Sequence, residues 1–174
     1  MQLSKSLSFV AAATAMCLAM TGCGGLFLSA SAEREAQLTV EVPAEQLVVQ
    51  GFNGSIEVEG SDELVDVQVT AKIRATGRDQ EQAESRLEEA ELTAVSEGGT
   101  LTISLDRPSG FSGAVSYDIK LPTGIAVVAE TSNGSVEILN TQAAVKVSTS
   151  NASVTVVEPM ERVDVRTSNA SVRV

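Results

Sequence analysis

Residue types that could carry catalysis or bind a metal are scarce in this sequence of 174 residues. It contains no His, and its two Cys, Cys17 and Cys23, both lie within the first 23 residues. The rest of the chain therefore has no Ser–His or Cys–His catalytic pair and no Cys or His metal site. Carboxylates are plentiful, with 23 Asp and Glu against 12 Lys and Arg. Paired acids, as in enzymes that cleave polysaccharides, are the catalytic arrangement left to consider.

Paired acids would have to recur in the C-terminal part, where the sequence repeats every 18 residues. The three matching segments are 131–138, 149–156 and 167–174. In this alignment Glu130 is followed by Ser148 and Arg166, and Glu137 is followed by Thr155 and Arg173. Neither column therefore stays acidic from one repeat to the next. The calcium-binding repeat Gly-Gly-x-Gly-x-Asp is also absent from the sequence. We therefore predict that the protein is not an enzyme and that it has no metal site and no cofactor.

Cys23 is the one residue whose surroundings predict a chemical modification. An apolar run at residues 7–20 follows Lys5, and at 14 residues it is too short to span a bilayer but typical of a secretory signal. The run ends in Met20-Thr21-Gly22-Cys23, which resembles the lipobox of bacterial lipoproteins. The resemblance implies cleavage before Cys23 and a diacylglyceryl group on its thiol. Gly24 follows, so the resemblance implies the outer membrane if the cell has two membranes.

Three regions of the chain follow from this interpretation. Residues 1–22 are predicted to be a lipoprotein signal peptide, and residues 23–36 a lipidated Cys with a linker that tethers the domain to the membrane. Residues 37–174 are predicted to form one β-strand-repeat domain. The formal net charge of −11 disfavours nucleic acid as a partner.

The 18-residue repeat predicts a β-solenoid, that is, stacked coils of two short strands and two turns. Val, Ile and Ala recur in interior columns, whereas the residues between them vary freely, and this alternation is typical of strands. The interior columns are Val127/Val145/Val163, Ala129/Val147/Val165, Val136/Val154/Val172 and Ile138/Val156/Val174. Asn133, Asn151 and Asn169 are predicted to form a ladder at the turns, because Asn tolerates left-handed backbone angles. The Thr column at 131, 149 and 167 is in phase with the interior, so it is predicted to point inward and bond between coils rather than to bind ordered water.

Further strands and one helix are predicted upstream of the repeat. The segment 51–58 echoes the repeat unit, and residues 64–75 alternate with Val65, Val67, Val69, Ala71 and Ile73 on one face. Strands are also predicted around residues 101–105 and 115–121. Residues 79–90 predict a peripheral, mostly exposed helix with Asp79 as its N-cap and a thin apolar stripe.

This order of features resembles the bacterial "putative adhesin" β-strand-repeat family, whose function is unknown. The features are an early Asn-Gly-Ser segment at 53–55, an acidic helix, a Gly-Gly-Thr-Leu-Thr-Ile strand at 98–103 and the recurring Thr-Ser-Asn units. The resemblance covers residues 37–174 and implies an all-β fold of the right-handed, single-stranded β-helix type in the cell envelope.

Three functions are compatible with these observations. The leading hypothesis is a non-catalytic cell-envelope lipoprotein, anchored to the membrane through Cys23, that serves adhesion, scaffolding or the binding of an envelope protein or surface glycan. The second is an envelope-stress or regulatory sensor that engages a membrane protein, and the third is a glycan-modifying enzyme. Val172 and Val174 also predict self-association through an apolar C-terminal edge.

Overall fold

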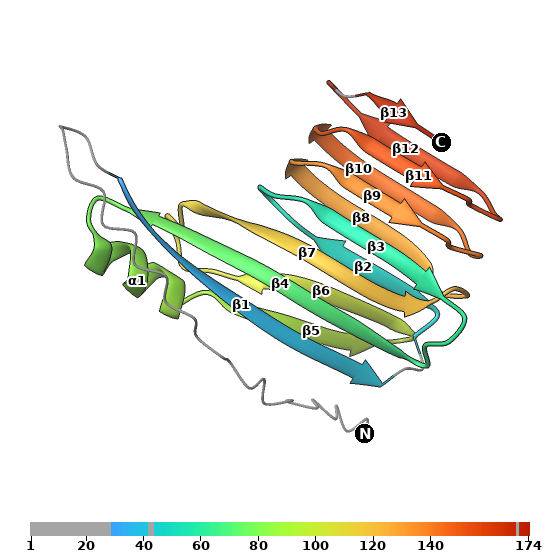
Figure 1. Ribbon diagram of the computed structural model, residues 1–174, viewed down its shortest axis with the longest axis horizontal. Coiled ribbons are helices and arrows are strands. Elements are labelled where there is room, and N and C mark those ends of the chain that lie inside the picture. The colour runs from blue at the N-terminus through green and yellow to red at the C-terminus, as the bar shows by residue number, and fades with distance from the viewer. Residues whose placement is uncertain (1–28, 42–43, 170) are drawn as a thin grey trace.

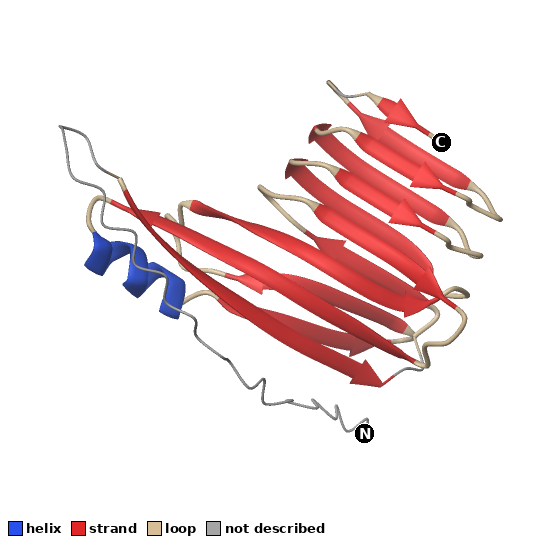
Figure 2. Ribbon diagram, viewed as in Figure 1, coloured by secondary structure: helices blue, strands red, loops and turns tan. Residues whose placement is uncertain are grey.

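The protein is a stack of two β-sheets, described by a computed structural model at residues 29–41, 44–169 and 171–174. Figure 1 shows the strands of both sheets lying roughly along one axis, some pointing one way and some the other, with a helix beside the first strand. Figure 2 shows how much of the described chain is strand. The fold is therefore mostly β and sandwich-like.

The larger sheet has seven strands and the smaller has six. In spatial order, the seven-stranded sheet consists of β1 (Ala30–Glu41), β4 (Asp66–Gly77), β7 (Gly113–Pro122), β3 (Ile56–Ser61), β9 (Val136–Leu139), β11 (Val154–Val157) and β13 (Val172–Arg173). The six-stranded sheet consists of β12 (Val163–Thr167), β10 (Val145–Asn151), β8 (Ala126–Asn133), β2 (Gln46–Gln50), β6 (Thr100–Asp106) and β5 (Glu91–Glu97).

The core between the sheets is almost entirely aliphatic. Side chains alternate along each strand, so every second residue faces the opposite sheet, and this residue is usually Val, Ile, Leu or Ala. Leu47, Ile103 and Ile138 are fully buried, and each such side chain contributes about 1.5–3 kcal/mol to stability. Tyr117 is the largest fully buried side chain. The sequence forms strands because β-branched residues pack well on a pleated, half-buried surface.

The predicted columns of the repeat are confirmed by the strand register. β8, β10 and β12 pair in parallel, with Val127 beside Val145 and Val145 beside Val163. β9, β11 and β13 pair in the same way on the opposite sheet, with Val136 beside Val154. The echo at residues 51–58 is also confirmed, since β3 pairs with β9 and Asn53 forms a parallel bridge with Asn133. The last members of the columns, from Val163 onward, are only partly buried or exposed because β12 and β13 are edge strands.

The prediction of a β-solenoid with 18-residue coils is wrong for this fold. β1 pairs antiparallel with β4, β4 antiparallel with β7, and β5 antiparallel with β6. The two sheets are therefore mixed and open, whereas coils wound around one axis need parallel neighbours throughout. The repeat occupies only the C-terminal part of the chain, and the long strands β1, β4 and β7 extend the larger sheet by antiparallel pairing between strands that are not consecutive in sequence.

Helix α1 (Gln80–Glu88) confirms the predicted helix and its cap. The Asp79 carboxylate accepts a hydrogen bond from the backbone N–H of Gln82 at 2.8 Å, which satisfies one of the open donors of the first turn. Only Ala83 and Leu87 of this helix are buried, and they pack against β1 and β4. The Arg34 guanidinium on β1 donates to the carbonyl of Ala90, just beyond the helix.

Two details of the N-terminal half differ from the sequence predictions. Residues 30–36, predicted to be part of the linker 23–36, lie in β1 and pair with residues 71–77 of β4. Their alternation explains this, because Ala32 and Ala36 are buried while Ser31 and Glu35 face solvent. Val65 was predicted to share a face with Val67 and Val69, which are buried, but it is 78% exposed, since β4 begins one residue later.

Candidate functional site

A row of Asn side chains lies along the turns at one end of the sandwich. Asn133 donates from Nδ2 to Oδ1 of Asn53 at 2.8 Å, and Asn151 donates to Asn133 and Asn169 to Asn151 at 3.2 Å each. Asn53 in turn donates to the carbonyl of Gly113. Asn53, Asn133 and Asn151 thus each use one donor and one acceptor, whereas Asn169 at the end of the row only donates. The row fixes the spacing of the turns, and it offers no group that could act on a substrate.

The Thr column points inward, as its phase predicts, but does not bond between strands. Thr131 and Thr149 are 8% and 7% exposed, and Thr167 stands next in the column. Their Oγ1 atoms are buried and have no hydrogen-bond partner among the described residues. The predicted bonding between stacked Thr hydroxyls is therefore wrong. An inward column also presents no hydroxyl array to ordered water.

The outer face of the seven-stranded sheet is strongly charged. Glu57 on β3 lies between Asp118 on β7 and Glu137 on β9, so three carboxylates occupy neighbouring strands. One position further, Lys120 pairs with Glu59 at 3.8 Å. Like charges on adjacent strands repel one another, which destabilises the sheet locally. This face is a solvated surface with no enclosed space.

The outer face of the six-stranded sheet is different, because its outward side chains carry no charge over β2 and over the middle of β5 and β6. We call this surface the neutral face, defined by the outward residues Thr93, Val95, Thr102, Ser104, Val48, Gln50 and Val128. Val95 is 56% exposed, and Val48 and Val128 are half-buried. Charged residues surround it: Glu97 and Asp106 at the strand ends, and Glu130 and Lys146 beside Gln50 and Val128 on the neighbouring strands. Interface centres are depleted of charge and surrounded by a polar rim in the same manner.

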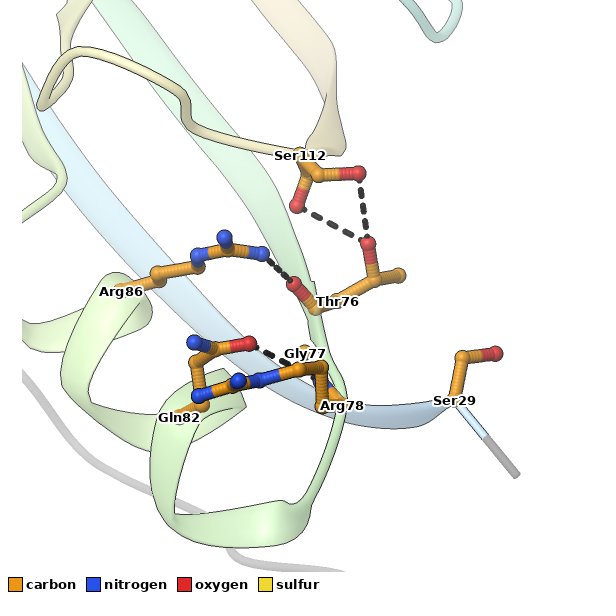
Figure 3. A pocket seen from close by; sticks show the side chains of 7 residues that line it. All are labelled: Ser29, Thr76, Gly77, Arg78, Gln82, Arg86 and Ser112. Carbon is orange, nitrogen blue, oxygen red and sulfur yellow. Dashed lines mark hydrogen bonds between the residues drawn. The ribbon is translucent and has the colours of Figure 1, made fainter. Parts of the chain in front are cut away.

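A second surface feature is an open basin where β1 begins and β4 ends. We call it the arginine basin; its volume is about 800 Å³ and its lining consists of Ser29, Thr76, Gly77, Arg78, Gln82, Arg86 and Ser112. Figure 3 shows Arg86 reaching from α1 to the carbonyl of Thr76, which accepts its hydrogen bond. The Thr76 hydroxyl bonds to Ser112 at 2.8 Å. No carboxylate lines the basin.

Neither of these two surfaces could be recognised from the sequence. The neutral face depends on which strands are neighbours, since β5, β6, β2 and β8 come from three separate parts of the chain. The outward Thr and Val residues could be identified in the sequence, but not the fact that they lie next to one another on adjacent strands. The arginine basin combines a strand end, a helix and the loop before β7, and no sequence motif marks it.

Cys23, the predicted lipidation site, lies outside the described residues. Among residues 29–41, 44–169 and 171–174, no group of three or more His, Cys, Asp or Glu residues could hold a metal ion. In the same part of the chain, no helix is both long enough and apolar enough to cross a bilayer. Burial raises the pKa of Tyr117 above its ordinary value, and the Arg107 charge opposes this more weakly.

Comparisons with known proteins find similarity of structure but not of sequence. No protein family matches the chain, and no curated protein matches it in sequence. A "putative cell adhesion protein" from Clostridium sporogenes is similar with a TM-score of 0.46 at 10% identity, over 82% of this chain and 98% of that one. A "putative adhesin" from Parabacteroides distasonis is similar with a TM-score of 0.44 at 11% identity, over 80% of this chain and 65% of that one.

Proposed function

We propose that the protein is a non-catalytic, lipid-anchored module of the bacterial cell envelope that binds a protein partner through the neutral face. The observation that supports this most directly is the distribution of charge. The chain has a formal net charge of −11, yet the outward side chains of β2 and of the middle of β5 and β6 carry none. Leaving polar, neutral and aliphatic side chains together on a flat surface lowers the cost of desolvating it.

A protein fits this face better than a small molecule does. Small ligands bind in concave sites that bury most of their surface, and the neutral face is an unbroken sheet surface. Val48, Val95 and Val128 supply apolar contact area, while Thr102 and Gln50 supply hydrogen-bonding groups beside them. Adhesion to another surface or scaffolding within the envelope would both use such a contact.

Substitution of Thr102 tests the role of the neutral face, with Thr70 as a matched control. Both are half-buried Thr residues that point outward from an inner strand, Thr102 on β6 and Thr70 on β4. Cells that lack the protein should attach less well to surfaces or to other cells, and the wild-type gene should restore attachment. Thr70→Lys should restore it equally, whereas Thr102→Lys should not, at equal amounts of exported protein. Full restoration by Thr102→Lys would refute the proposed binding face.

The anchor is tested separately by mass spectrometry of the protein purified from its own cells. We expect the mature chain to begin at Cys23 and to carry a diacylglyceryl group. The sequence Thr21-Gly22-Cys23 after an apolar run supports this expectation. An unmodified Cys23 or a mature chain that begins elsewhere would refute the anchor without affecting the proposed binding face.

A further inference from the structure

The arginine basin concentrates positive charge in an acidic protein. Arg78 and Arg86 both line it, and the ion pairs among the described residues are Arg74–Glu33, Lys120–Glu59 and Arg166–Asp164. The residues outside the described ranges include no Asp or Glu. Arg78 and Arg86 therefore have no carboxylate partner, although the chain has 23 acidic residues.

The acidic residues of α1 do not cancel this charge. Successive helical residues are about 100° apart, so Gln82 and Arg86 share one side of α1. The same spacing puts Glu81, Glu84 and Glu88 on the opposite side, where they are exposed. Glu89, the C-cap, lies on the side of Arg86, but its carboxylate accepts a hydrogen bond from the Ser85 hydroxyl at 3.3 Å and is in none of the ion pairs named above. Asp79, at the start of the helix, is engaged with the backbone of Gln82 as its cap.

The basin also has the hydrogen-bonding groups that an anion requires. The bond from Arg86 to the Thr76 carbonyl uses one of the five N–H donors of the guanidinium and fixes its position. Ser29 and Ser112 add hydroxyl groups to the lining. An arginine fork with neighbouring hydroxyl groups suits the tetrahedral oxygens of a phosphate group.

The position of the basin indicates which phosphate is near. Ser29 lies six positions after Cys23, and a fully extended segment of this length reaches about 20 Å. If Cys23 carries a lipid, the basin cannot be further than this from the lipid headgroups. Phe111, next to Ser112, packs on Phe52 with ring centroids 5.9 Å apart, and Arg107 lies 4.1 Å above the Phe52 ring. Aromatic and basic side chains together are typical of surfaces that lie on a membrane.

We propose that the arginine basin binds the phosphate of an anionic phospholipid in the membrane that holds the anchor. The end of the sandwich where β1 begins then rests on the bilayer, and the charge on Arg78 and Arg86 is neutralised there. This proposal rests on the proposed lipid anchor for the proximity of the bilayer. The attraction should weaken as the salt concentration rises, because exposed charges are screened.

Hydrogen exchange of the whole mature protein on vesicles tests the proposal. Vesicles of phosphatidylcholine alone are compared with vesicles that also contain phosphatidylglycerol. We expect amide exchange at residues 76–82 and 112–113 to be several-fold slower on the anionic vesicles. Arg78→Gln with Arg86→Gln should abolish the difference, whereas Arg74→Gln, which removes a charge from the outer face of β4, should preserve it. Equal exchange on the two kinds of vesicle in the wild-type protein would overturn the proposal.

Two further measurements separate the sources of failure. Inorganic phosphate is added to the protein on phosphatidylcholine vesicles, and protection by phosphate without protection by anionic vesicles would refute a lipid ligand. The mass of the same preparation shows whether Cys23 is acylated. If the protein carries no acyl chains but is still protected by added anionic vesicles, the proposed anchor is refuted and the proposed lipid site is supported. An acylated protein without protection would refute the lipid site alone.

Discussion

Replacing Thr149 by Val removes a hydroxyl group that is buried without a hydrogen-bond partner. Thr149 lies on the inner side of β10 between Thr131 and Thr167, and its Oγ1 atom is out of contact with solvent. Val has nearly the same shape and favours strands as strongly as Thr does. The substitution therefore changes little except the polarity of one buried group.

The expected gain follows from two contributions. A buried polar group without a partner costs about 1–3 kcal/mol, and an added buried methyl group contributes about 0.8 kcal/mol. Thr149 is 7% exposed, so both apply almost fully. We expect Thr149→Val to raise the free energy of unfolding by about 1–2 kcal/mol. This is less than the sum of the two contributions, because the added methyl group is crowded by Thr131 and Thr167.

Urea unfolding followed by circular dichroism would measure this gain. Thr155→Val serves as the control, because Thr155 lies on the outer face of β11 and is half-buried, so its hydroxyl group reaches water. The control should change stability by less than about 0.5 kcal/mol. Unchanged or lower stability of Thr149→Val would refute the reasoning and would mean that the hydroxyl group has a partner such as a buried water.

Four other perturbations test the fold. Val154→Asp should cost at least about 3 kcal/mol because Val154 is 1% exposed, whereas Thr155→Asp should cost under about 1 kcal/mol; similar losses in thermal melts would contradict the inside–outside assignment. Glu57→Lys should stabilise by about 0.5 kcal/mol in urea unfolding, since carboxylates flank Glu57 on both neighbouring strands, and the gain should shrink at high salt. The pKa of Tyr117 is raised in the folded state, so the contribution of Tyr117 to the free energy of unfolding is complete below pH 10.0, the ordinary pKa of Tyr. Above that pH the free energy of unfolding should fall by up to about 1.4 kcal/mol per pH unit. Alkaline melts of Tyr117→Phe should lack this decline. The predicted self-association through the edge of β12 and β13 should appear in light scattering as a mass that grows with concentration, and Val165→Lys should prevent it; a wild-type monomer throughout would contradict it.

The inward columns could be predicted from the sequence because two periods coincide there. The period of two residues determines which face each side chain occupies, and the repeat of 18 residues determines its neighbour on the next strand. Val127 and Val145 could therefore be paired before the structure was known, and the structure confirms the pair. The helix could be predicted from Asp79 and the composition that follows it.

Strand direction could not be predicted because alternation carries no information about it. β4 has the same inward residues whether its neighbours run parallel or antiparallel to it. Its pairing with β1 and β7 depends on contacts between residues far apart in the chain, such as Ala36 with Ala71. Extending the solenoid geometry from the repeat to the whole chain was wrong for this reason.

The change from Gly to Ala between the first and second repeats can be explained only from the three-dimensional structure. Gly134 has a φ of +134°, and a Cβ atom there would lie 2.0 Å from the carbonyl oxygen of Gly54. Gly54 is constrained in turn by the backbone of Val115 on β7. The corresponding residue of the next repeat is Ala152, whose side chain is buried. The change from Asn-Gly to Asn-Ala thus follows the distance from β7, where turn backbones approach most closely.

The distribution of charge follows from how the chain is divided between the sheets. Outward acids and bases are frequent on β1, β3, β4 and β7 of the seven-stranded sheet, and α1 carries further carboxylates beside it. In the six-stranded sheet they occur on β8, β10 and β12 and at the ends of β5 and β6. The short strands β2 and β6 carry outward Gln, Val, Thr and Ser and meet in this same sheet. A high net charge keeps a protein soluble, and keeping that charge away from β2 and the middle of β5 and β6 leaves an uncharged surface there. Solubility and an uncharged contact surface are opposing demands on most small domains, and here different strands meet each of them.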